Sequence, residues 1–180
     1  RKREAFFKAL LFSSAGSVIH AVSDEQDMRK MGSLSKFLPL TYSLMLIGSL
    51  SLSGFPFLSG FYSKDFIIEL SQVASCSSLN MSYGLFACWL ASSAIFFTAF
   101  YSFRLVYLTF LNISNTSRVI VLNIHESSWL ITLPLLILGF GSIFIGYLTK
   151  DIFIGFGSDF WGPAIFILPC NSYVLEAEWL

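Results

Sequence analysis

The chain has 180 residues, of which 55% are hydrophobic and 12% are charged, and its mean hydropathy is +0.71. Soluble domains carry about 25% charged residues, so this composition indicates a protein that resides in a lipid bilayer. The 11 basic and 11 acidic residues cancel, and no basic patch indicates a nucleic acid as a partner. The three cysteines lie far apart, so their spacing predicts neither a disulfide framework nor a zinc site.

Charged residues divide the chain into apolar stretches, and a helix needs about 20 residues to cross the hydrocarbon core. The five candidate membrane-spanning stretches are 5–22, 37–63, 83–111, 129–148 and 152–168. The last one is interrupted by glycine and proline and predicts a weak or distorted span. Because no stretch alternates as a strand does, we expect an all-α polytopic membrane protein with about four to five transmembrane helices.

The two most basic connections, 23–36 and 112–128, follow alternate spans. They are therefore expected on one side of the membrane, which the positive-inside rule makes the matrix or cytoplasmic side. Within the first connection, Ser23 or Asp24 is a candidate cap for a short helix that Gly32 would end.

The stretch Phe37–Leu70 is too long for one straight helix across the bilayer. Its 34 residues would reach roughly 51 Å at 1.5 Å each, against a hydrocarbon core of about 30 Å. Gly54, Pro56 and Gly60 predict a break, because proline removes a backbone donor and glycine accepts irregular angles. Unwound backbone at membrane depth needs protein or water around it, and broken helices mark ion or substrate sites in transporters.

Lys64 and Asp65 follow this break directly. In one interpretation Lys64 ends the span and reaches the lipid headgroups, with Asp65 as its partner. In the other, Lys64 lies within the protein at membrane depth, where burial disfavours its charged form and allows proton exchange. The sequence pattern is compatible with both interpretations.

Three other ionisable residues lie in or near apolar stretches. Lys8 is an interfacial residue if its helix starts at the recorded N-terminus, and a functional residue near the membrane centre if the helix begins upstream. His20, twelve residues further on or about 18 Å along a helix, is either a proton relay near neutral pH or an end-of-helix residue that only hydrogen-bonds. Arg104 is either a snorkelling anchor or a buried counter-charge.

Several motifs together give the sequence a specific resemblance. They are "FFKALLF" (6–12), "DEQDMRKMG" (24–32) and "GFYSKD" (60–65), continued by "YSFRLVYLTFL" (101–111) and "FILPCNSYVLEAEWL" (166–180). With these motifs the chain resembles NADH–ubiquinone oxidoreductase chain 5, the distal antiporter-like membrane subunit of respiratory complex I, in its plant-type mitochondrial form.

This resemblance implies a proton-translocating subunit that binds no cofactor or metal of its own. NADH, FMN, iron–sulfur clusters and ubiquinone would be bound by other subunits. Lys8 would be the central-axis lysine of the second inverted repeat, and Lys64 would be the terminal proton-transferring lysine on the broken helix. Asp65 would modulate Lys64, and His20 is the weakest of the four candidates for proton transfer.

The resemblance also implies an organisation. Residues 1–112 would be the second half of the antiporter-like proton-translocating repeat, and residues 113–180 would be C-terminal transmembrane helices leading towards a lateral helix that is missing here. Glu4 stands where the family usually has histidine. Together with an end at Leu180, this departure predicts a split or partial subunit.

Expected partners are the other membrane-arm subunits of complex I, the N-terminal part of the same subunit, the adjacent antiporter-like chain 4, and lipids such as cardiolipin, all in the mitochondrial inner membrane. Two other functions remain compatible with the sequence. One is a secondary cation/proton antiporter without a redox partner. The other is a structural segment of the distal arm with an inactive charge path, which Glu4 would favour.

Overall fold

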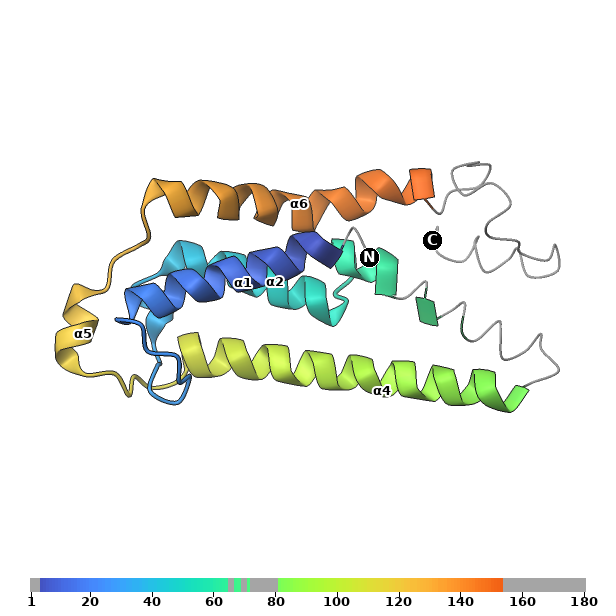
Figure 1. Cartoon of the computed structure of the whole chain (residues 1–180), viewed down its shortest axis with the longest axis horizontal. Helices are drawn as coiled ribbons and strands as arrows, with labels where there is room; N and C mark the ends of the chain where they lie inside the picture. Colours follow the sequence, from blue (N-terminus) through green and yellow to red (C-terminus); the bar gives the residue numbers. More distant parts are fainter. Residues whose placement is uncertain (1–3, 65–66, 69–70, 72–80, 154–180) are drawn as a thin grey trace.

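The computed structural model describes residues 4–64, 67–68, 71 and 81–153, and the regular structure within these ranges is helical. Four long helices lie along one axis in an elongated bundle (Figure 1): α1 (Glu4–Ala21), α2 (Pro39–Ser53), α4 (Met81–Val106) and α6 (Trp129–Phe153). The shorter elements are the 3₁₀ turn η1 (Leu34–Lys36), the π-helical turn η2 (Tyr107–Leu111) that continues α4, and α5 (Arg118–Asn123). The all-α expectation is confirmed over the described ranges.

Two helices are long and apolar enough to cross a bilayer, Tyr83–Leu111 and Trp129–Thr149, while the apolar segments Ala5–Ala21 and Pro39–Ser53 are shorter. Large apolar side chains are exposed on the outer sides of α4 and α6, among them Phe86, Trp89, Phe97, Phe100, Leu133, Ile137, Phe140 and Phe144. Such surfaces suit lipid or neighbouring protein rather than water. The predicted stretch 152–168 lies outside the described residues except for its first two.

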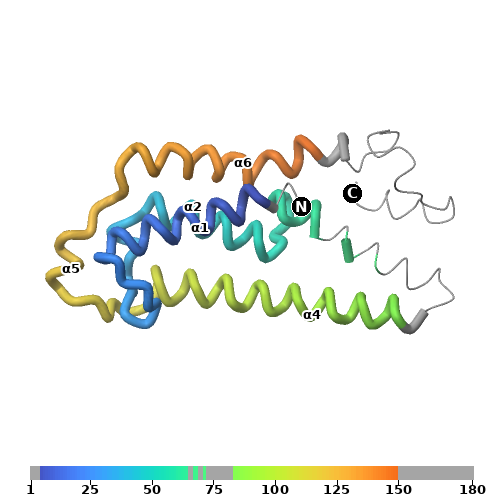
Figure 2. Tube along the Cα trace, in the orientation of Figure 1, coloured from blue at the N-terminus to red at the C-terminus, as the bar shows by residue number. Residues whose placement is uncertain are grey.

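The central helix of the bundle is α2, which packs against α1, α4 and α6. α1 and α2 run antiparallel, and α6 and α4 lie on opposite sides of this pair (Figures 1 and 2). Leu10, Leu44 and Leu135 form a buried cluster that joins α1, α2 and α6. Side chains from the three neighbouring helices and their connections can therefore contact α2.

The two basic connections lie at the same end of the bundle, as their alternation predicted. The Ser33 amide donates to the Asn112 carbonyl at 2.8 Å. The Asn115 side chain donates to the Arg29 carbonyl at 2.9 Å. A buried cluster that includes Val22, Met31, Leu34 and Phe110 lies beneath these loops. Hydrogen bonds and apolar packing thus hold the first connection against the second.

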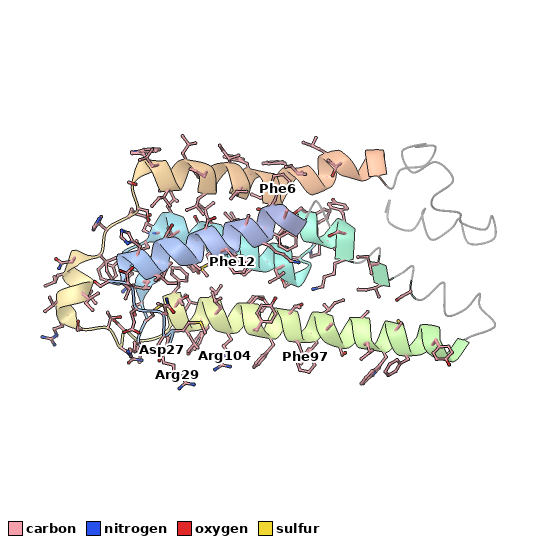
Figure 3. All side chains as sticks on the ribbon, in the orientation of Figure 1. Phe6, Phe12, Asp27, Arg29, Phe97 and Arg104 are labelled. Atoms are coloured by element: carbon pink, nitrogen blue, oxygen red, sulfur yellow. The ribbon has the colours of Figure 1, made fainter. Side chains whose placement is uncertain are left out.

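The prediction of a short helix between Ser23 and Gly32 is wrong. Ser23 and Asp24 adopt left-handed backbone angles, with φ of 57° and 62°, so they end α1 instead of capping a new helix. The Asp27 carboxylate then accepts the Arg29 amide at 3.0 Å, which makes a local turn at the loop end of the bundle (Figure 3). Aspartate side chains compete with helical hydrogen bonding in this way.

An exposed ion pair joins Lys30 and Glu25, with Nζ and Oε2 2.9 Å apart. The hydrogen bond from Lys30 lowers the pKa of the Glu25 carboxyl below 4.5, and the same contact raises the pKa of Lys30 above 10.5. The small stabilisation from this pair is therefore present at neutral pH. It is lost when acid protonates Glu25 or strong alkali neutralises Lys30.

The break predicted within the second apolar stretch is confirmed. α2 ends at Ser53, and Gly54 follows in a left-handed conformation with φ of 88°. The Phe55 amide donates back to the Leu50 carbonyl at 3.0 Å, which is the bond of a glycine-terminated helix end. The chain becomes helical again over 59–64. The glycine and proline of this region thus end one helix and allow another to start close by.

The helix that follows the break packs closely through small residues. A Cβ atom on Gly60 would overlap the Ser51 carbonyl, and one on Gly146 of α6 would overlap the backbone of Ser59. The Ser51 and Ser59 hydroxyls are hydrogen-bonded at 3.2 Å. Small residues permit such approaches between membrane helices. Residues 59–64 are thereby fixed between α2 and α6.

Gly60→Ala is expected to destabilise the protein by about 1–3 kcal/mol, because its new methyl group would meet backbone atoms that cannot rotate away. Gly16→Ala is the matched control, since nothing lies within 4 Å of its Cβ position. Alanine is also the better helix former. The thermal midpoint of the membrane protein carrying each change measures the effect. Equal midpoints for the two variants would contradict this close packing.

Candidate functional site

The Lys64 side chain folds back across the break to the end of α2. Its Nζ donates to the Leu52 carbonyl at 3.1 Å and to the Thr98 hydroxyl at 2.9 Å. The alkyl stem passes Gly54, because its Cδ lies 3.6 Å from the position that a Cβ would take there. The side chain is half-buried. Lys64 therefore links the two halves of the broken helix to α4.

The Leu52 carbonyl is available because α2 ends one residue later. The last four carbonyls of a helix have no partner within it, and together they carry a partial negative charge that stabilises a nearby cation. An ammonium group at this position satisfies an orphan carbonyl and benefits from the helix dipole. The break thus creates the acceptor that Lys64 uses.

Thr98 places the Lys64 amine beside the middle of the long apolar span Tyr83–Leu111. Thr98 is 15 residues after the start of the Tyr83–Leu111 span and 13 before its end. An amine 2.9 Å from the Thr98 hydroxyl is therefore far from both ends of this apolar span. A contact with the middle of an apolar span is compatible with a lysine at membrane depth.

Lys8 lies close to the middle of the apolar span Trp129–Thr149. Two residues before it, Phe6 packs against α6 (Figure 3), with its Cδ1 2.9 Å from the Cβ position of Gly141. Gly141 is close to the middle of the Trp129–Thr149 span. The Lys8 side chain is exposed in this chain, whereas Phe7 beside it is buried. Neither α2 nor α6 therefore covers the Lys8 side chain.

Lys8 and the Leu52 carbonyl lie at similar depths. The Leu11 side chain contacts Gly48 of α2, with its Cγ 3.0 Å from the Gly48 Cβ position. Lys8 precedes Leu11 by three residues and Leu52 follows Gly48 by four, which are steps of about 4.5 and 6 Å along antiparallel helices. Lys8 and the Leu52 carbonyl, which accepts from Lys64, therefore lie at about the same level along the bundle.

The other predicted residues are not brought to this level. His20 is 79% exposed at the loop end of α1, with Nδ1 3.9 Å from the Asp24 carboxylate. Arg104 is exposed and points away from α2 along the outer side of α4 (Figure 3), which matches an anchor rather than a buried counter-charge. Asp65 lies outside the described residues. Within the described part of the chain, no three His, Cys, Asp or Glu side chains gather as a metal site.

Sequence reasoning missed two oxygens that bind Lys64, those of the Thr98 hydroxyl and the Leu52 carbonyl. Thr98 lies in the aromatic-rich run "IFFTAFY" (95–101), and a hydroxyl at the centre of a predicted span was the available signal. The Leu52 carbonyl is a backbone atom, so its only signal was the predicted break itself. Both partners depend on contacts that the spacing of residues along the chain does not specify.

The other end of α2 is capped by a carboxylate from a distant segment. Its N-cap residue, Leu38, makes no side-chain cap, and Pro39 has no amide hydrogen. The Leu40 amide instead donates to Oε1 of Glu126 at 2.9 Å. The second oxygen of Glu126 is buried and has no hydrogen-bond partner among the described residues. A negative group thus lies at the N-terminus of α2 and Lys64 at its C-terminus, and both complement the helix dipole.

The described part of the chain is thus an all-helical membrane-type bundle, with one broken helix and a lysine amine beside the middle of a long apolar span. Residues 4–90 match the family model described as NADH:quinone oxidoreductase/Mrp antiporter, transmembrane.

Curated relatives extend the match over 174 residues, or 97% of the chain. The chain is 68% identical to NADH-ubiquinone oxidoreductase chain 5 of Chondrus crispus, 57% identical to that of Marchantia polymorpha and 55% identical to that of Triticum aestivum. It covers 26%, 25% and 25% of these proteins, so it spans about a quarter of their length. The resemblance inferred from the motifs is confirmed: the chain is related to a segment of the chain 5 proteins.

Glu126→Ala is expected to weaken the start of α2 by about 1 kcal/mol, the usual effect of removing a helix cap. Glu126→Gln keeps an acceptor oxygen at this position and should retain most of the cap. Hydrogen–deuterium exchange of a peptide covering residues 38–45 measures the difference. Faster exchange in Glu126→Ala alone would support the cap, whereas identical exchange in all three proteins would contradict it.

Proposed function

We propose that the chain forms part of the proton-translocating membrane subunit of an NADH:ubiquinone oxidoreductase in the mitochondrial inner membrane, with Lys64 as a proton-transferring group. The observation that carries this proposal is the half-buried Lys64 amine on the Leu52 carbonyl and the Thr98 hydroxyl, at the centre of a membrane span. Intramembrane ionisable groups of this kind are characteristic of ion and proton pathways. The names of the chain 5 relatives supply the reaction to which this pathway would be coupled.

Lys64 suits proton transfer because a lysine can lose its proton when its surroundings change, whereas arginine stays charged. A positive charge arriving beside Lys8 would disfavour the protonated form of Lys64. At an effective dielectric constant of about 20, two unit charges must approach within about 12 Å to change proton affinity tenfold. Lys64 would then release its proton towards the side of the membrane opposite the basic connections. Asp65, which follows it in sequence, would modulate this release.

The proposal assigns the redox chemistry to other subunits. NADH, FMN, iron–sulfur clusters and ubiquinone would be bound there, and this chain would receive the energy as an electrostatic change. Residues 1–112 would supply the second half of the antiporter-like repeat, and 113–180 the following membrane helices. The remaining membrane-arm subunits, including the adjacent chain 4, would be its partners, with lipids such as cardiolipin at the outer surfaces.

The family description also includes Mrp antiporters, which keeps a secondary cation/proton antiporter as the second candidate. The high identity to chain 5 proteins over nearly the whole chain favours the first. Co-purification separates the two, because a large NADH-oxidising assembly would carry the chain in the first case and a smaller antiporter complex in the second.

Lys64→Met and Lys64→Arg are both expected to reduce NADH-driven proton transport by about tenfold or more, since neither side chain exchanges a proton near neutral pH. Lys36→Met is the matched control, because Lys36 is exposed in the loop-end turn η1. Proton transport is measured in vesicles containing the complete assembled enzyme, after assembly has been verified for each variant. Undiminished transport by assembled Lys64→Met would rule out the proton-transfer role.

A further inference from the structure

Thr98 contacts Lys64 through a hydroxyl whose hydrogen-bonding direction is already fixed. Its Oγ1 donates to the Ile95 carbonyl one turn earlier on α4 at 2.7 Å. A threonine hydroxyl has one hydrogen to donate, so the oxygen can only accept from Lys64. The 2.9 Å contact is therefore a bond from the Lys64 amine to an oriented acceptor.

We propose that Thr98 is the positioning residue of Lys64, whose hydroxyl oxygen holds the amine against the carbonyl end of α2 at the membrane centre. This inference rests on the proposed function of Lys64. The Leu52 carbonyl is the second acceptor. Two acceptor oxygens bind an ammonium group more strongly than a neutral amine, because charge-assisted hydrogen bonds are the stronger ones. The two oxygens therefore bind the protonated Lys64 side chain more strongly than the neutral one.

The local structure of α4 makes Thr98 a rigid partner. The bond to Ile95 fixes the side-chain rotamer of this β-branched residue, so Oγ1 has one position relative to the helix axis. Phe96 and Phe97 beside it point outward, 68% and 64% exposed, while Thr98 is half-buried. α4 packs against α2, which carries the other acceptor. Thr98 thereby couples the position of the Lys64 amine to the spacing of these two helices.

Two pairs of side chains at position 98 test the contribution of the hydroxyl group by itself. Valine at position 98 replaces the hydroxyl of threonine with a methyl group, and alanine differs from serine by the hydroxyl oxygen alone. Thr98→Val and Thr98→Ala are expected to reduce NADH-driven proton transport about tenfold, which is the factor by which losing a hydrogen bond to a charged group typically shifts the equilibrium that it stabilises. Thr98→Ser is expected to retain at least half of the wild-type rate.

Thr109→Val is the matched control on the same long span. Thr109 is buried and also bonds to a preceding carbonyl, that of Leu105 at 2.8 Å, but lies three turns away from Thr98. The assembled Thr109→Val enzyme should transport protons at the wild-type rate. A general intolerance of valine in this span would instead impair Thr98→Val and Thr109→Val alike, and that result would overturn the inference.

The measurements are made in the complete assembled enzyme, with Lys64→Met alongside. The positioning role is supported if proton transport is impaired in Thr98→Val and Thr98→Ala but retained in Thr98→Ser. Loss of packing alone would not be restored by one oxygen atom. Equal rates, or equal assembly defects, in Thr98→Ala and Thr98→Ser would overturn it. If proton transport is impaired in Lys64→Met but normal in Thr98→Val, only the role of Thr98 is overturned. If proton transport is normal in Lys64→Met, the proposed function itself is overturned.

Discussion

The structure depends on the hydrogen bond between the Lys64 amine and the Leu52 carbonyl across a broken helix. An unpaired carbonyl in the hydrocarbon core costs several kcal/mol, and an ammonium group there is also costly unless it is paired. The Leu52 carbonyl accepts from the Lys64 ammonium group, which also donates to Thr98. The break is therefore tolerated because a lysine lies ten residues after Gly54, and the lysine is tolerated because the break exposes a helix terminus to it.

The neighbouring elements keep this contact in place. Close packing of Gly60 against Ser51 and of Gly146 against Ser59 fixes the helical residues 59–64, so the Lys64 stem starts from a defined position. Thr98 provides the second acceptor, and Glu126 holds the far end of α2. The charges at the two ends of α2 both match its dipole. α2 thus carries complementary charge at each terminus while its sides are packed by three other helices.

Periodicity and composition were sufficient to predict the helical class, four of the apolar stretches and the break at Gly54–Gly60, because these follow from local backbone chemistry. They did not predict the turn at Asp27, where a side chain competes with helix formation, nor the Thr98 partner. Lys8 and Lys64 could be named as candidates, yet their positions along the bundle follow only from the contacts of Phe6 with Gly141 and of Lys64 with Thr98. Contacts between helices depend on tertiary packing, which spacing along the chain does not encode.

The most direct test is an experimental structure of the complete assembled protein in a lipid environment, at a resolution that locates the Lys64 amine. The account predicts Nζ within hydrogen-bond distance of both the Leu52 carbonyl and the Thr98 hydroxyl, midway between the two headgroup layers. A Lys64 amine among lipid headgroups, with the Leu52 carbonyl bonded within an unbroken helix, would contradict it.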